Sequence, residues 1–196
     1  SVRVEKDVKL LQEQFMSGLL EHSGDGFPDS LDEINRRFGL AFKADSFQAF
    51  VVKADVHFDS VNPNVQKLLS EKSVLTISEL LSPKCHACLL YPTERGVYGV
   101  ANFSEPNSKA LRRAMQTVID ELQSQRELFD RIKVTIGLGQ PSTGIANLAA
   151  SLGEAEAAIA NRLIHGPGRI IERYADQDLV GIVNRVITPE VRKRLL

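Results

Sequence analysis

The sequence FQAFVVKADVHF, residues 47–58, is rich in β-branched and aromatic residues, a composition typical of a buried strand. Downstream of it, the residue pattern predicts a helix over 64–81, which ends before Pro83. Two strands are expected next, at 86–91 and 97–103, because a turn sequence with proline and glycine joins them. This central stretch therefore predicts strand, helix and hairpin in succession.

The same alternation continues to residue 171. A capping residue, Asn107 or Ser108, starts a long helix that runs to about residue 128, and a strand is expected over 132–139. An alanine-rich helix over 145–163 follows, with small residues that allow close packing on a sheet, and a last strand lies at 170–171. The order is thus βαββαβ followed by one αβ unit.

Two βαβ crossovers that share an antiparallel hairpin form the split βαβ, ferredoxin-like plan. We therefore predict an α+β fold with a single sheet of mixed, largely antiparallel strands and with helices mainly on one face. The length of 196 residues suits one compact domain, or one domain with a helical appendage.

An amphipathic helix is predicted over residues 3–22, before the first strand. Its apolar stripe has spacings of three and four residues and consists of Val4, Val8, Leu11, Phe15 and Leu19. Two interpretations remain open at this point. The helix packs on its own domain, or it forms a short parallel coiled coil that leads in from an upstream domain and supports dimerisation.

A second, short helix is predicted to begin at Ser30, in a capping box with Glu33, and to end at Gly39. Residues 30–40 look like the first half of a helix-turn-helix. A DNA-binding unit of that kind needs a polar, basic recognition helix next, but the buried strand follows instead. We therefore expect no DNA binding through this segment.

The composition is that of an ordinary globular protein, with 43% hydrophobic and 25% charged residues. A net charge of −1 creates no overall field that would attract nucleic acid or anionic lipid. No apolar run is long enough to span a bilayer, and two cysteines make no disulfide framework, so we expect a cytoplasmic protein without a membrane partner. Because the first residue is serine, we expect the chain to be a piece of a longer protein.

Two further motifs favour structural roles. Cys85 and Cys88 are three residues apart at the start of a predicted strand, so their side chains are expected on opposite faces, as packing residues. The sequence GLGQPS, residues 137–142, ends a strand before a helix but lacks the spacing of a phosphate-binding loop. We attribute its glycines to turn geometry.

Three segments carry a family resemblance: VTIGLG at 134–139, GPGRII at 166–171 and YAD at 174–176. They resemble the closing half of the degenerate GGDEF-like domains of bacterial transcription regulators, with the YesN group of AraC-type response regulators nearest and the PucR and CdaR regulators more distant. The likeness covers most of residues 10–176. It implies the palm fold of a nucleotide cyclase.

The resemblance also implies a domain plan. Residues 1–23 would be a linker helix, 24–176 the GGDEF-like domain, and 177–196 a helical linker toward a DNA-binding domain outside this chain. In that family the domain lies between a phosphate-accepting receiver and a helix-turn-helix pair. DNA would then be a partner only of the longer protein, and this chain would form a homodimer.

The residues that a diguanylate cyclase needs are largely replaced. Such an enzyme uses a Gly-Gly turn, an acidic residue in that turn and a metal-binding aspartate at the end of the first strand. Here the hairpin sequence is YPTERGVY over 91–98, in which Glu94 is a lone carboxylate that Arg95 could neutralise. At the strand end, Asp55, His57 and Asp59 alternate onto one face, either as weak ligands of a divalent cation or as a solvated strand end.

We therefore expect no catalytic residue, no bound metal and no cofactor. The five residues at the strand end and the hairpin would line a vestigial ligand cleft. The sequence favours a non-catalytic module for signal relay and dimerisation in a two-component transcription regulator. A sensor of a small molecule or nucleotide is the alternative, and a residual nucleotide cyclase is a third possibility.

Overall fold

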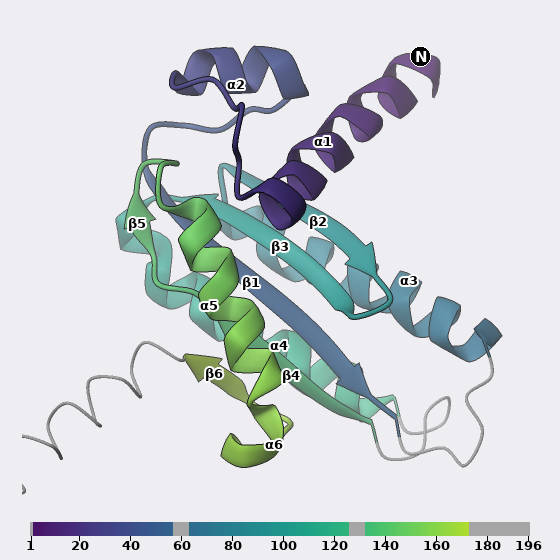
Figure 1. The fold of residues 1–196 in the computed structure, drawn as a ribbon. Coiled ribbons are helices and arrows are strands. Elements are labelled where there is room, and N and C mark those ends of the chain that lie inside the picture. Colours follow the sequence, from purple (N-terminus) through teal and green to yellow (C-terminus); the bar gives the residue numbers. More distant parts are fainter. Residues whose placement is uncertain (1, 57–62, 126–131, 173–196) are drawn as a thin grey trace, which may run out of the picture.

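The computed structural model describes residues 2–56, 63–125 and 132–172, and Figure 1 shows their arrangement. One sheet organises these residues, with strand order β2-β3-β1-β4-β6. Every neighbouring pair is antiparallel except β4 and β6, which are parallel. The strands are β1 (Ser46–Asp55), β2 (Ala87–Thr93), β3 (Gly96–Phe103), β4 (Lys133–Leu138), β5 (Ser142–Thr143) and β6 (Ile170–Glu172).

The helices are α1 (Val2–His22), α2 (Leu31–Phe38), α3 (Pro63–Leu81), α4 (Ser108–Ser124), α5 (Leu148–Ala160) and α6 (Arg162–His165), with 3-10 turns η1 (Ser82–Lys84) and η2 (Glu105–Asn107). The order β2-β3-β1-β4, with α3 and α4 in the crossovers, is the predicted split βαβ plan. The α+β class and the N-terminal helix are confirmed as well.

The placement of helices mainly on one face is wrong, because helices cover both faces of the sheet (Figure 1). Phe50 and Val52 of β1 pack toward α3 and α4, whereas Ala49 and Val51 pack toward α1, α2 and α5. The added αβ unit is the reason. Its helix α5 crosses from β4 to the parallel strand β6 over the face that the split βαβ core leaves open, and α1 and α2 extend that layer.

Burial on both faces also explains the composition of β1. Its first seven residues are all buried, so the strand is a nearly continuous apolar run rather than an alternating one. Two buried polar side chains interrupt the run. Gln48 donates a hydrogen bond of 2.9 Å to the carbonyl oxygen of Gly139, and Ser46 lies at the start of the strand.

Glycines let β4 and the loop after it approach α5 closely. A Cβ atom at Gly139 would overlap the carbonyl oxygen of Ser151, and one at Gly137 would overlap that of Ala155. This confirms the close packing predicted for the alanine-rich helix. The need for glycine at 139 comes from this helix contact and not from the turn geometry that was expected to explain it.

Smaller differences concern the ends of elements. The predicted helix 145–163 is divided at Asn161 into α5 and α6, and the two-residue strand β5 was not predicted. Ser30 has the extended backbone of an N-cap but makes no capping hydrogen bond with its side chain, so the capping box with Glu33 is not formed. Gly39 ends α2 in the left-handed conformation, with φ of 62°, as predicted.

Candidate functional site

A cavity of about 670 Å³ opens where the predicted vestigial cleft was expected. It lies between the C-terminal end of β1, the N-terminal half of α3 and the turn that joins β2 to β3, and we call it the cleft. Apolar side chains from all three elements line it, among them Val52, Val65 and Val97. Polar groups lie around them, including Asp55, Ser70 and Glu94. The cleft thus offers an apolar surface with a polar rim, which is the usual composition of a small-molecule site.

The hairpin turn beside the cleft is tight and internally bonded. The hydroxyl of Thr93 accepts a hydrogen bond from the backbone N–H of Arg95 at 3.1 Å and donates one to the carbonyl oxygen of Gly96 at 3.0 Å. Gly96 has a φ of 143°, and a Cβ there would lie 2.6 Å from the carbonyl oxygen of Val52. Only glycine therefore lets the hairpin lie this close to β1.

The carboxylate of Asp55 is bound by an arginine that lies far from it in the sequence. Arg162 donates from Nε to Oδ2 at 2.6 Å and from Nη2 to Oδ1 at 2.8 Å, and its Nη1 also donates to the carbonyl oxygen of Ile159. The hydrogen bond to Asp55 raises the pKa of Arg162 above its ordinary value. A permanent positive charge is thus held against both oxygens of the strand-end carboxylate.

The neutralisation of Glu94 by Arg95 is not what the structure shows. Both side chains are exposed, and Nη1 of Arg95 lies 3.8 Å from Oε1 of Glu156 on α5. The Arg95 guanidinium also lies 5.8 Å from the centre of the Tyr98 ring. Because the Arg95 guanidinium extends toward α5, it contacts Glu156 and not Glu94.

The buried Tyr98 contacts the same glutamate as Arg95. The hydroxyl of Tyr98 donates a hydrogen bond of 2.8 Å to Oε1 of Glu156. Burial, together with that carboxylate, raises the pKa of Tyr98 to about 12. Tyr98, Glu156, Arg95 and Arg162 line a second cavity of about 580 Å³ on the α5 face of the sheet.

The structure therefore divides the five residues predicted for the ligand cleft. Asp55 and Glu94 line the cleft, Glu94 and Arg95 line the second cavity, and His57 and Asp59 lie outside the described residues. Across residues 2–56, 63–125 and 132–172, no group of three or more His, Cys, Asp and Glu side chains is arranged to hold a metal ion. Nothing in the sequence pattern pointed to Arg162, which comes 107 residues after its partner.

The residues predicted for dimerisation are also divided. Phe15 and Leu19 are buried in the chain's own core, where Phe15 packs against the rings of Phe27 and Phe38 at 5.1 and 5.4 Å. Val8 and Leu11 are half-buried beside the end of α2. Val4 is 60% exposed on the part of α1 that projects from the body (Figure 1). The C-terminal half of the helix therefore packs on its own domain, and only the N-terminal end of the stripe faces solvent.

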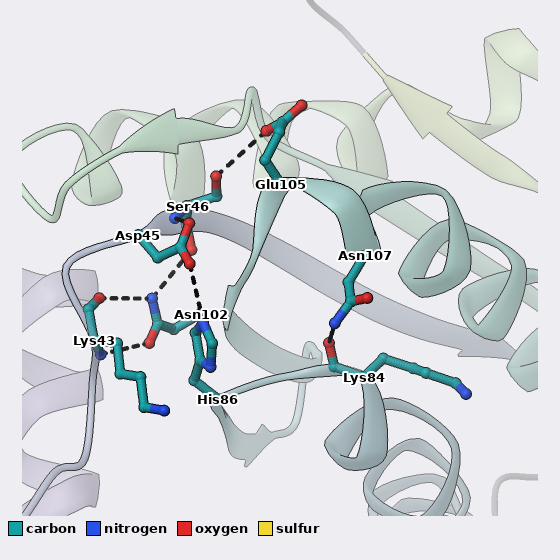
Figure 2. A network of polar contacts seen from close by, with 8 residues as sticks. All are labelled: Lys43, Asp45, Ser46, Lys84, His86, Asn102, Glu105 and Asn107. Atoms are coloured by element: carbon teal, nitrogen blue, oxygen red, sulfur yellow. Dashed lines mark hydrogen bonds and ion pairs between the residues drawn. The ribbon is translucent and has the colours of Figure 1, made fainter.

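A polar network at the opposite end of β1 was not predicted (Figure 2). The fully buried Asn102 donates to the carbonyl oxygens of Lys43 and Ser46 and accepts a hydrogen bond from the N–H of Lys43. Next to it, Nε2 of His86 lies 3.0 Å from Oδ2 of Asp45, and this contact lowers the pKa of Asp45. The network fixes the chain where it enters the sheet, away from the cleft.

The family model described as GGDEF-like domain matches residues 23–160, well over half of the chain. No curated protein matches. Of the helices in the described ranges, none combines the length and apolar content that crossing a membrane requires.

Proposed function

The chain belongs to the GGDEF-like domain family, and from this premise we propose that it is a non-catalytic regulatory domain that relays a signal within a larger protein. The observation that carries the proposal is the pair formed by Asp55 and Arg162.

Metal-dependent nucleotidyl transfer needs carboxylate oxygens that are free to ligate the metal ions. In this domain both oxygens of Asp55 accept hydrogen bonds from Arg162. A divalent cation at the same carboxylate would have to displace the guanidinium and would then lie beside its positive charge. The pair therefore supports loss of the metal site that a cyclase uses.

The hairpin turn supports the same proposal. The hydroxyl and backbone of Thr93 close a compact turn, where a cyclase would have a Gly-Gly pair that lets the nucleotide approach the backbone. Glu94 contributes one exposed carboxylate there, and Arg95 contacts Glu156 instead of the cleft.

Incubation with GTP or ATP in the presence of Mg²⁺ or Mn²⁺, followed by analysis of the nucleotides, tests the proposal. We expect the triphosphates to remain unchanged. Formation of a cyclic mono- or dinucleotide that depends on Asp55 would show that the domain is a cyclase.

We further propose that the larger protein is a cytoplasmic transcription regulator of the AraC type, with a receiver domain before this chain and a helix-turn-helix domain after it. The motif resemblance of 134–139 and 166–171 supports this context. The projecting end of α1, with exposed Val4 and Leu10, would support homodimerisation. Light scattering of the chain with its upstream domain is expected to show a dimer, and a strict monomer at high concentration would contradict the proposal.

A second candidate function is a sensor that binds a small molecule without converting it. The specific observation in its favour is the cleft, since a cavity of about 670 Å³ has room for a metabolite or nucleotide. A ligand that binds only the folded state raises the melting temperature by mass action. A thermal-shift screen with nucleotides and metabolites, repeated on Ser70→Tyr to fill the cleft, therefore separates a sensor from a domain that only transmits a signal.

A further inference from the structure

The two cysteines of the chain lie on the same side of the sheet. In β2, Cys88 and Leu90 pack against the core under α3 and α4, and Leu89 and Tyr91 face the other way, as strand alternation requires. Continued alternation would place Cys85 on the face of Leu89. It packs instead against the same core as Cys88, so the expectation of opposite faces is wrong.

The cause is the turn before the strand. Cys85 ends the 3-10 turn η1, and its N–H donates to the carbonyl oxygen of Ser82 at 3.2 Å, while regular strand structure begins only at Ala87. The chain bends between these points and returns the Cys85 side chain to the α3 face. There the thiols of Cys85 and Cys88 are close enough for each to shift the pKa of the other.

The surroundings give the two sulfurs different chemistry. Both are free thiols and only partly buried, so a small oxidant can reach them. The nearby Cys88 thiol lowers the pKa of Cys85, whereas the Cys85 thiol and burial raise the pKa of Cys88 well above its ordinary value. Because the thiolate is the reactive form, Cys85 is the nucleophile of the pair.

We infer that Cys85 and Cys88 are a peroxide-reactive pair that forms a reversible intramolecular disulfide. The Cys85 thiolate attacks one oxygen of the peroxide, the O–O bond breaks, and the leaving oxygen takes up a proton as water. The sulfur of Cys88 then attacks the sulfenic acid on Cys85, and the hydroxyl leaves as a second water with the Cys88 proton. Two thiols lose two electrons in all, and one peroxide gains them.

The bond would join the end of η1, which follows α3, to the edge strand β2. Both α3 and the β2–β3 turn border the cleft. The disulfide would thus join α3 and the β2–β3 hairpin, which form two walls of the cleft, at the ends that lie away from it. The inference itself does not depend on the proposed function, because it concerns only the two thiols.

The experiment is titration of the chain with hydrogen peroxide under native conditions, with free thiols counted after unfolding. Because the chain has only two cysteines, the count is unambiguous. We expect one equivalent of peroxide to remove both thiols, the mass of the monomer to fall by two hydrogen atoms, and dithiothreitol to restore both thiols. Persistence of both thiols, or disulfides only between chains, would overturn the inference.

Two variants test the roles of the sulfurs. In Cys88→Ser, which keeps a hydroxyl donor beside Cys85 but removes the second sulfur, Cys85 is expected to accumulate as a sulfenic acid that dimedone traps. In Cys85→Ser, Cys88 is expected to stay reduced at the same peroxide dose. Circular dichroism checks that each variant is folded. If a variant fails to fold, brief peroxide exposure of the wild-type chain with dimedone gives the same information, and dimedone found on Cys88 rather than Cys85 contradicts the assignment.

Discussion

The guanidinium of Arg162 binds both carboxylate oxygens of Asp55, at 2.6 and 2.8 Å, and so joins the start of α6 to the end of β1. The two side chains are 20% and 33% exposed, so the pair is largely shielded from solvent. This bond places a fixed positive charge against the strand-end carboxylate, as the proposed loss of a metal site requires.

Replacing the arginine is expected to weaken the fold. Because Arg162→Met leaves the Asp55 carboxylate without its partner, the free energy of unfolding should fall by about 1–3 kcal/mol. Arg162→Lys keeps the charge but cannot donate to both carboxylate oxygens in the same geometry. The free energy of unfolding should therefore fall in Arg162→Lys by less than it does in Arg162→Met. Urea denaturation of the three proteins measures both effects. Equal stability of Arg162→Met and wild type would show that the pair contributes nothing.

The Tyr98 phenol is expected to ionise at a higher pH than an ordinary tyrosine. The folded-state pKa of about 12 exceeds the ordinary value of 10.0, so the protonated phenol stabilises the fold. That stabilisation is complete below pH 10 and is lost as the pH rises toward 12. Absorbance titration of phenolate should therefore show one tyrosine ionising near pH 12, and Tyr98→Phe should remove that step.

The Glu156 carboxylate supplies part of this shift and offers a matched control. Glu156→Gln keeps an oxygen that can accept the Tyr98 hydrogen bond but removes the negative charge. The pKa of Tyr98 should then fall toward its ordinary value while staying above it, because burial remains the largest cause. If Tyr98→Phe still shows one phenol that ionises near pH 12, that ionisation belongs to another tyrosine.

Two glycines near the same helix should respond to alanine in opposite directions. Gly139→Ala places a Cβ against the backbone of Ser151 and should cost about 1–3 kcal/mol of unfolding free energy. Gly153 lies within α5 with open space around its Cβ position. Gly153→Ala should therefore stabilise the domain by about 0.5–1 kcal/mol, through helix propensity. Chemical denaturation compares them, and a harmless Gly139→Ala would contradict the close packing of α5.

Two substitutions in α1 should affect different properties, one the stability of the fold and the other self-association. Phe15→Ala empties a fully buried site and should cost about 3–5 kcal/mol. Val4→Asp changes an exposed position on the same helix, so it should leave the unfolding free energy nearly unchanged and weaken only a dimer. Denaturation and light scattering of both variants check this. A large loss of stability in Val4→Asp would show that the N-terminal end also packs on the domain.

Much of the fold could be predicted from local sequence. The apolar run of β1 and the hairpin with its tight turn depend on neighbouring residues, and each formed close to its predicted bounds. The side of the sheet that each helix covers depends on contacts between distant segments, such as Phe15 with Phe38 and Phe42. Periodicity carries no such information, and the prediction that the helices lie mainly on one face of the sheet was wrong.

The candidate site shows the same limit. Asp55 and Glu94 could be found because Asp55 ends β1 and Glu94 lies in the turn between β2 and β3, and both line the cleft. Arg162 could not, since an arginine after an alanine-rich helix resembles any solvated residue until the fold brings it to β1. The face of Cys85 was missed because the bend after η1 has no distinctive residue. The domain boundaries at 23, 176 and 177 remain predictions.

Binding of Mn²⁺ tests most directly whether Asp55 is withheld from metal ions. Titration followed by electron paramagnetic resonance would compare the wild-type chain with Asp55→Asn, Arg162→Met and the double variant. We predict that wild type and Asp55→Asn bind Mn²⁺ equally weakly, and that Arg162→Met gains binding that the double variant loses. Mn²⁺ binding by the wild-type chain that Asp55→Asn abolishes would contradict the account.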